Sequence, residues 1–278
     1  MGNTFLCGRF ELDLERPLVM GIVNVTPDSF SDGGEHADTD SAVSHARRLI
    51  DEGAHILDLG GESTRPGAEP VSIKDELARL LPVIEALRDC GLPLSVDTFK
   101  PEVMRATLDA GADMINDIYA FRQPGAVEAV AASRCGLCVM HMQGEPGTMQ
   151  RAPVYVDLLG EISTFLGARV QALLAAGVDS QRIVLDPGFG FGKTADHNYQ
   201  LLRGLSSLRV SSYPLLTGLS RKTMIGDATG KPVADRVAGS IAGALACVAR
   251  GSSIVRVHDV AQTVDALKVW YASEQGAI

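Results

Sequence analysis

The chain has 278 residues, of which 46% are hydrophobic, and its formal net charge at pH 7 is −9. A chain of this size buries roughly three quarters of its unfolded surface, so it needs no disulfide or structural metal to fold. The acidity argues against a general affinity for nucleic acid or an anionic membrane, so an anionic substrate would need a local cluster of basic residues.

The N-terminus and the cysteines indicate where the chain is expected to work. Residues 1–7 lack a basic region followed by an apolar core, and no run reaches about 18 apolar residues. We therefore expect neither a signal peptide nor a membrane span. The 5 cysteines are an odd number spread through apolar segments, which is typical of a reducing cytoplasm.

Short apolar runs alternate with longer amphipathic runs along the chain. The short runs are rich in Val, Ile and Leu and predict buried parallel strands. In chain order they are residues 18–24, 55–60, 94–97, 114–117, 137–141, 183–186, 215–218 and 254–258. Apolar stripes predict helices at residues 41–52, 73–89, 154–176, 233–250 and 260–271, and another helix begins near Pro101.

Eight such units in succession, with no linker and no change in composition, predict one (β/α)8 TIM barrel. We expect a single α/β domain over residues 1–278, with its core at about residues 17–272. The alternative fold is a doubly wound open sheet, and the count of eight favours the barrel.

Polar side chains end most of the predicted strands. They are Asn24, Asp97, Asn116, Asp117, His141, Asp186, Arg256 and His258. Any one of them could simply cap the following helix. In barrels of this kind, however, the chemistry lies at the carboxyl ends of the strands, so their convergence on one rim predicts a functional site. Two long, turn-rich segments, 26–34 and 61–67, follow the first two strands and are typical of active-site loops.

The segment 187–194 ends in Gly-Lys-Thr and looks like a nucleotide-binding P-loop. Pro187 stands where that motif needs glycine, and it has no N–H to offer a phosphate. We therefore expect the glycines to let the backbone pack close to a flat ligand instead.

Two further patterns predict structural roles. Cys135 and Cys138 have redox spacing, but residues three apart in a strand face opposite sides, so both are expected to be inert. The remaining histidines have no other potential metal ligand at the spacing typical of zinc sites, so they predict no zinc site. They are His36, His45, His55 and His197.

Basic residues gather near the end of the chain. Ser220, Arg221 and Lys222 follow the seventh strand, and Arg256 and His258 share a face of the eighth. Loops after these two strands are the usual phosphate site of the fold, so we expect an anionic group to bind here.

Eight separate motifs give the chain a family resemblance. Residues 21–34, 58–67, 95–98, 115–117, 140–143, 186–193, 220–222 and 256–259 are similar, in order, to the signatures of dihydropteroate synthases. The resemblance covers about residues 17–272.

The resemblance implies a pterin pocket made of Asp97, Asn116, Asp186 and Lys222. The pterin ring presents a guanidine-like edge of N–H donors, and an ionised carboxylate such as Asp186 accepts two of them in one plane. Asn116 offers both a donor and an acceptor, Asp97 would bind the reduced ring, and Lys222 would donate to ring acceptors.

The resemblance also implies a p-aminobenzoate pocket, which is the sulfonamide target in family members. Beside Lys222, its residues here would be Phe30, Thr64, Arg65, Pro66, Phe191 and Ser220.

The resemblance further implies that Asn24, Arg256 and His258 bind a pyrophosphate group together with Mg2+ as cofactor. Mg2+ prefers oxygen ligands, so the amide oxygen of Asn24, phosphate oxygens and waters would hold it. Asp32 is a weaker candidate for the outer shell of the metal. Lys222, Arg256 and His258 are the expected catalytic residues. They would act through positioning and leaving-group electrostatics, since no nucleophile–base pair is evident.

The implied activity is a transferase reaction of folate biosynthesis between a dihydropterin pyrophosphate and p-aminobenzoate. The enzyme would be a cytoplasmic homodimer that binds neither nucleic acid nor membrane. Two alternatives stay open. A methyltetrahydrofolate-dependent methyltransferase would share the barrel but has no use for Lys222 and the Arg256/His258 pair. A non-catalytic pterin-binding paralogue would be expected to lose Asn24 or Arg65, and both are present.

Overall fold

Eight parallel strands close into a barrel in the computed structural model, which describes residues 4–25, 34–63, 69–145, 147–208, 210 and 213–275. The strand order is β10-β3-β4-β5-β6-β7-β8-β9, and β10 pairs with β3 to complete the ring. The strands are β3 (Leu18–Asn24), β4 (Ile56–Gly60), β5 (Leu94–Asp97), β6 (Met114–Asp117), β7 (Gly136–Met140), β8 (Ile183–Asp186), β9 (Leu215–Thr217) and β10 (Ser252–Val257). The predicted TIM barrel is confirmed, and the open sheet is excluded because the ring closes.

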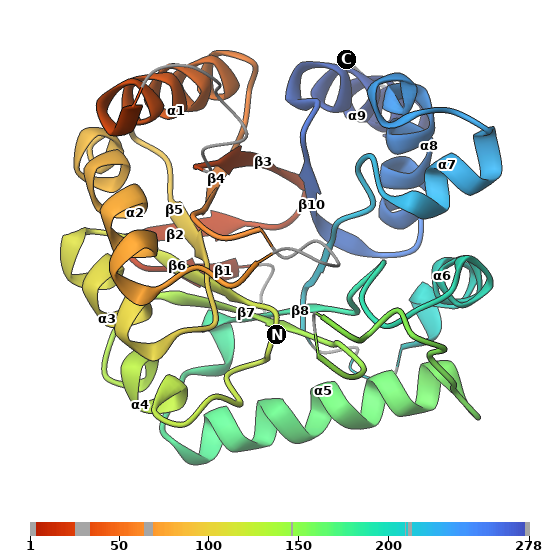
Figure 1. Cartoon of the computed structure of the whole chain (residues 1–278). Coiled ribbons are helices and arrows are strands. Elements are labelled where there is room, and N and C mark those ends of the chain that lie inside the picture. Colours follow the sequence, from red (N-terminus) through yellow and green to blue (C-terminus); the bar gives the residue numbers. More distant parts are fainter. Residues whose placement is uncertain are drawn as a thin grey trace.

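Helices surround the barrel (Figure 1). They are α1 (Gly34–Asp51), α2 (Ile73–Leu87), α3 (Pro101–Ala110), α4 (Ala126–Ala131), α5 (Leu158–Ala175), α6 (Ala195–Arg203), α7 (Thr223–Thr229), α8 (Val237–Val248) and α9 (Val260–Gln275). Pro101 stands at the start of α3, as predicted.

Two helices begin later than the sequence predicts. The helix expected from residue 154 begins at Leu158, because the Asp157 side chain caps it by accepting from the Gly160 N–H. Val156 before the cap is 99% exposed. The helix expected over residues 233–250 is a short 3-10 turn, Val233–Asp235, followed by α8.

Helix α5 is long and apolar enough to cross a membrane by length and composition alone. Its buried residues lie four, or in one case three, positions apart and join the core around the barrel; they are Leu158, Ile162, Leu166, Val170 and Leu173. This spacing is typical of a helix packed on one face. The apolar character of α5 is therefore explained by its contact with the barrel core.

A hairpin that the sequence patterns missed closes the amino end of the barrel. Strands β1 (Thr4–Cys7) and β2 (Phe10–Asp13) pair antiparallel. Phe5 is fully buried among inward-facing residues of the barrel, including Met20 and Cys138. A Cβ on Gly136 would lie 2.7 Å from the Phe5 ring, so glycine is needed there. The amino end is thus filled by side chains, and the polar residues lie toward the carboxyl end.

Candidate active site at the carboxyl end of the barrel

Arg256 and two carboxylates form an ionic cluster inside the carboxyl end of the barrel. The Arg256 Nε donates to Asp58 Oδ2 at 2.5 Å, and the Arg256 Nη2 donates to Asp97 Oδ2 at 2.9 Å. Burial lowers the pKa of Arg256, but Asp58 and Asp97 outweigh that effect and raise it, so the guanidinium stays charged. The cluster therefore carries two carboxylates around one permanent cation.

Asp97 keeps one oxygen free for a ligand. Its Oδ1 atom is buried and has no hydrogen-bond partner among the residues that the structure describes. Burial raises the pKa of Asp97 to about 7, although Arg256 acts in the opposite direction. A buried polar atom without a partner is costly, which indicates that a bound molecule completes its hydrogen bonding.

Asp186 and Lys222 are two further charged groups of the site, and they interact electrostatically. Asp186 is buried at the end of β8, and its Oδ1 accepts from the Gly188 N–H at 2.7 Å. Burial raises the pKa of Asp186 above its usual value, and the charge of Lys222 offsets only part of this rise. Burial lowers the pKa of Lys222 to about 8. Lys222 Nζ donates to the Phe189 carbonyl and lies 4.7 Å from the centre of the Phe191 ring.

The loop at residues 187–194 is tied to the chain itself. Gly188 has φ +71°, and a Cβ there would lie 1.9 Å from the His141 carbonyl oxygen. Lys193 Nζ donates to the carbonyls of Gly188 and Phe191 at 2.9 and 3.1 Å and contacts His141 Nδ1 at 3.0 Å. The Lys193 ammonium therefore binds groups of the protein itself and does not point toward a phosphate as a P-loop lysine would. Gly188 is needed for close packing against the backbone that follows β7.

Asp117 and His141, which we expected on the rim, turn outward. The Asp117 carboxylate accepts from the N–H groups of Tyr119 and Phe121 at 2.7 and 2.6 Å and so caps the following turn. The His141 ring packs edge-on against Phe165 of α5 at 5.0 Å. Burial and Lys193 lower the pKa of His141 to about 2, so the ring is neutral. For these two residues the rim prediction was wrong, and their roles are structural.

Comparison with known proteins agrees with this geometry. Residues 20–258 match the family described as pterin binding enzyme. A dihydropteroate synthase of Escherichia coli strain K12 is 49% identical over 259 residues, which is 93% of this chain and 92% of that protein. One from Neisseria meningitidis serogroup C is 52% identical over 275 residues, or 97% of each chain.

Solved structures agree as well. A Xanthomonas albilineans dihydropteroate synthase with 4-aminobenzoic acid superposes with a TM-score of 0.93 at 53% identity, covering 99% of both chains. A Burkholderia cenocepacia dihydropteroate synthase with 7,8-dihydropteroate has a TM-score of 0.91 at 55% identity, covering 99% of this chain and 98% of that one.

The chain belongs to the dihydropteroate synthase family.

The structure brings part of the family's expected site together. Asp97, Asn116 and Asp186 are buried at the carboxyl ends of β5, β6 and β8, and the Lys222 ammonium lies over the Phe191 ring. The predictions for Phe30, Asp32, Thr64, Arg65 and Pro66 fall outside the described residues. Asp58 was missed as a site residue; a charged side chain between Leu57 and Leu59 in an apolar strand was the available signal.

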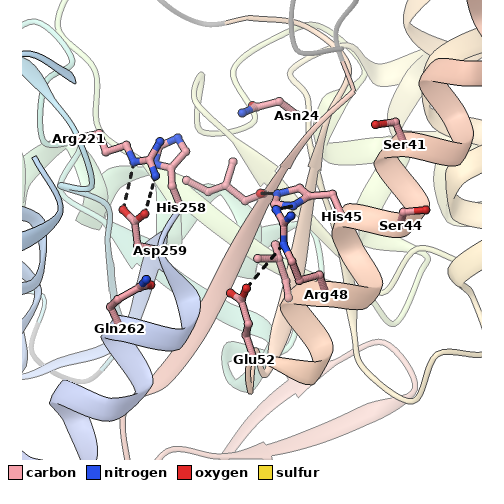
Figure 2. Close-up of a pocket in the computed structure, with 12 residues that line it drawn as sticks. Asn24, Ser41, Ser44, His45, Arg48, Glu52, Arg221, His258, Asp259 and Gln262 are labelled. Atoms are coloured by element: carbon pink, nitrogen blue, oxygen red, sulfur yellow. Dashed lines mark hydrogen bonds and ion pairs between the residues drawn. The ribbon is translucent and has the colours of Figure 1, made fainter. Parts of the chain in front are cut away.

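A cavity of about 550 Å³ lies beside the barrel and is lined by Asn24 and His258. The family resemblance assigns both residues to the pyrophosphate group. Figure 2 shows this cavity between α1, which carries His45 and Arg48, and the start of α9. Ser220 Oγ accepts from the His258 backbone N–H at 3.2 Å and contacts its Nδ1 at 3.0 Å.

Arg221 also lines the cavity, but its guanidinium pairs with Asp259 at 2.5 Å. The basic cluster is therefore divided between two places. Lys222 and Arg256 face the barrel interior, while Arg221 and His258 face the outer cavity.

The two spaced cysteines are both buried. Burial raises the pKa of the Cys135 and Cys138 thiols above their usual value. Neither is in the state that reacts, because the thiolate is the nucleophile.

Proposed function

We propose that the chain condenses 6-hydroxymethyl-7,8-dihydropterin pyrophosphate with p-aminobenzoate to give 7,8-dihydropteroate and pyrophosphate, a step of folate biosynthesis. The observation that carries the proposal is the set of buried charges at the barrel mouth, above all the unpartnered Oδ1 of Asp97 and the Asp186–Lys222 pair. Among the residues that the structure describes, no group forms a hydrogen bond with that oxygen. The test is formation of dihydropteroate from both substrates by the purified protein. Tight pterin binding without product would leave a non-catalytic pterin-binding protein instead.

The pterin fits the inner part of the site. Asp186, when ionised, would accept two N–H bonds from the guanidine-like edge of the ring, and the positive charge of Lys222 favours that ionised form. The second oxygen of Asp97 would accept a further N–H of the reduced ring. Lys222 would donate to a ring acceptor, because an ammonium has three donors and the Phe189 carbonyl takes one of them. Asn116 would contact the same ring edge.

The p-aminobenzoate ring would lie near Phe191 and Ser220, which border the pterin part on the Lys222 side. Phe30, Thr64, Arg65 and Pro66 would complete this pocket, as the family resemblance implies. A Yersinia pestis dihydropteroate synthase, 47% identical to this chain, has been solved with a sulfonamide drug. We therefore propose that sulfonamides compete at this pocket.

Arg65→Ala is expected to separate the two halves of the site. An arginine suits the carboxylate of p-aminobenzoate, so the variant should bind p-aminobenzoate at least roughly tenfold more weakly. Pterin affinity should change far less. Calorimetric titration of each ligand measures both effects, and equal losses for the two ligands would refute the division of the site.

Pyrophosphate would leave from the outer part, where Asn24 and His258 line one cavity. Arg256 comes two residues before His258, at the end of β10. The described residues hold no group of three or more His, Cys, Asp or Glu side chains that could bind a metal alone. Mg2+ would therefore take one oxygen from Asn24 and the rest from phosphate and water, which is a coordination that this ion accepts. When bound, the ion would neutralise charge on the leaving group.

The reaction needs no strong base. The aromatic amine is already neutral near pH 7, and breaking the C–O bond at the pterin methylene first releases pyrophosphate and gives a cation that the ring delocalises. The amine nitrogen then forms a bond to the methylene carbon, and the resulting ammonium loses one proton to water or to the released pyrophosphate. Lys222, Arg256 and His258 would hold the ring and the departing phosphates in place. Such a site acts by positioning and by electrostatic stabilisation of the leaving group.

Pterin binding should depend on pH. Burial raises the pKa of Asp97 to about 7 and lowers that of Lys222 to about 8. Below pH 7 Asp97 gains a proton and loses an acceptor, and above pH 8 Lys222 loses its charge. Affinity should therefore peak between these values and fall by up to roughly tenfold for each pH unit on the acidic side. Asp97→Asn should flatten only the acidic side of the profile, and an unchanged acidic side would show that another group titrates.

The remaining properties are also proposals. We propose a cytoplasmic homodimer that binds small molecules and neither nucleic acid nor membrane. The five free cysteines support a reducing compartment, and the net charge of −9 supports the absence of nucleic acid. Light scattering of the purified protein measures the oligomeric state.

A further inference from the structure

Asp58 is a fully buried carboxylate in the middle of β4, one layer below the residues that face the barrel mouth. It accepts three hydrogen bonds: from Ser95 Oγ at 2.6 Å, Asn116 Nδ2 at 3.2 Å and Arg256 Nε at 2.5 Å. Burying a carboxylate is costly even when it is paired. The placement therefore calls for an explanation beyond filling the barrel, which β6, two strands away, does with the apolar Met114.

The chemistry of Asp58 fixes the orientation of Asn116. An ionised carboxylate only accepts hydrogen bonds, so the atom of the Asn116 amide that faces it must be the NH2 group. The carbonyl Oδ1 is thereby turned away from Asp58 and held as an acceptor for a ligand. The reversed amide would place its oxygen against the carboxylate and offer the ligand no acceptor.

Asp58 fixes Arg256 in the same way. It takes the Nε of the guanidinium, and Asp97 takes Nη2. Two carboxylates bound to two nitrogens of a planar guanidinium restrict the plane in which it lies. One buried carboxylate thus sets the direction of two side chains to which the proposed function gives contact with substrate.

We propose that Asp58 is a positioning residue of the pterin site. It holds the Asn116 carbonyl toward a ring N–H and fixes the direction of the Arg256 guanidinium, without touching the substrate itself. This inference rests on the proposed function, because it requires that a pterin occupies the site.

The test uses four variants of the full chain and the binding of 6-hydroxymethylpterin by calorimetry. Asp58→Asn keeps size and shape but can present its own NH2 to Asn116, so the amide loses its fixed direction. Pterin affinity should fall roughly tenfold or more. Ser95→Ala removes a bond to Asp58 that leads to neither Asn116 nor Arg256, and its affinity should change less than roughly threefold. Ser95→Ala is the matched control.

The double variant Asp58→Asn/Asn116→Ala, compared with Asn116→Ala alone, tests whether Asp58 acts through Asn116. Once the Asn116 amide is gone, its direction no longer matters, and only the effect through Arg256 remains. The loss of pterin affinity caused by Asp58→Asn should therefore be at least about threefold smaller in the Asn116→Ala background than in the wild-type background. The KM for p-aminobenzoate should stay near the wild-type value in Asp58→Asn and in the double variant. A general loss of structure would instead raise both this KM and the dissociation constant for the pterin.

Three outcomes overturn the proposal. They are unchanged affinity in Asp58→Asn, an equal loss in Ser95→Ala, and an undiminished effect of Asp58→Asn in the Asn116→Ala background. Thermal unfolding of each variant checks that the protein being titrated is folded. Failure of the wild-type chain to bind the pterin at all would instead sink the proposed function.

Discussion

Asp186→Ala is expected to abolish pterin binding, with a loss of roughly a thousandfold or more. Asp186 is buried at the end of β8, close enough to Lys222 for that lysine to oppose the effect of burial on its pKa. Removing one partner of a buried charge pair costs about 2–5 kcal/mol, and each factor of ten in affinity is about 1.4 kcal/mol. The variant also loses both acceptors for the donor edge of the ring.

The conservative variant separates recognition from local structure. Asp186 also accepts from the Gly188 N–H at 2.7 Å, so part of any effect of the alanine variant could come from the loop. Asp186→Asn keeps an oxygen for that bond but presents one NH2 to the donor edge of the pterin. Calorimetry should show a large loss in both variants. Unchanged pterin affinity in either would refute the assignment of Asp186.

Lys100→Met is expected to cost about 3–5 kcal/mol of folding free energy. Lys100 Nζ lies 2.6 Å from carboxylate oxygens of both Glu62 and Glu76, and it donates to the Val71 carbonyl at 2.7 Å. Removing it leaves two carboxylates close together with no cation, and breaking a buried pair from one side has a cost of this size. Chemical denaturation measures the loss of unfolding free energy.

Two controls identify the cause. Lys74→Met removes an exposed lysine from α2 and should change stability by no more than about 0.5 kcal/mol. Glu76→Gln in the Lys100→Met background removes one of the stranded charges and should restore part of the stability. A Lys100→Met protein as stable as the wild type would mean that the lysine is not needed by the buried carboxylates.

The stability of the Lys100→Met protein should depend on pH in a defined direction. Burial raises the pKa of Glu76, and Lys100 acts against it. Without Lys100 the folded-state pKa rises further, so the folded protein binds more protons than the unfolded chain. Stability is then lost as pH rises from the unfolded-state pKa through the folded-state pKa, and the gap to the wild type should widen over this interval, above about pH 4.5.

The strand pattern was enough to predict the barrel, but it could not say which way each polar residue points. Asn116 and Asp117 are adjacent at the end of β6; Asn116 faces the interior and Asp117 caps the next turn. Side chains alternate along a strand, so a one-residue change in where a strand ends reverses the assignment. For the same reason His141, at the end of β7, packs outward against α5.

Other features depend on contacts far apart in sequence. The role of Asp58 becomes evident only from its hydrogen bond with Arg256, which lies 198 residues later in the sequence. Lys193 looks like part of a phosphate loop until its contacts with His141 and two carbonyls are known. The hairpin β1–β2 has strands of only 4 residues, too short for a clear period, and it is stable because Phe5 is buried in the barrel.

The most direct test of the central claim is pyrophosphate release by the purified protein from the dihydropterin pyrophosphate and Mg2+, measured with and without p-aminobenzoate. We expect release that depends on p-aminobenzoate, with dihydropteroate formed in equal amount. Release that does not depend on p-aminobenzoate, or no release despite tight pterin binding, would contradict synthase activity. Failure to bind the pterin at all would contradict the assignment of the site itself.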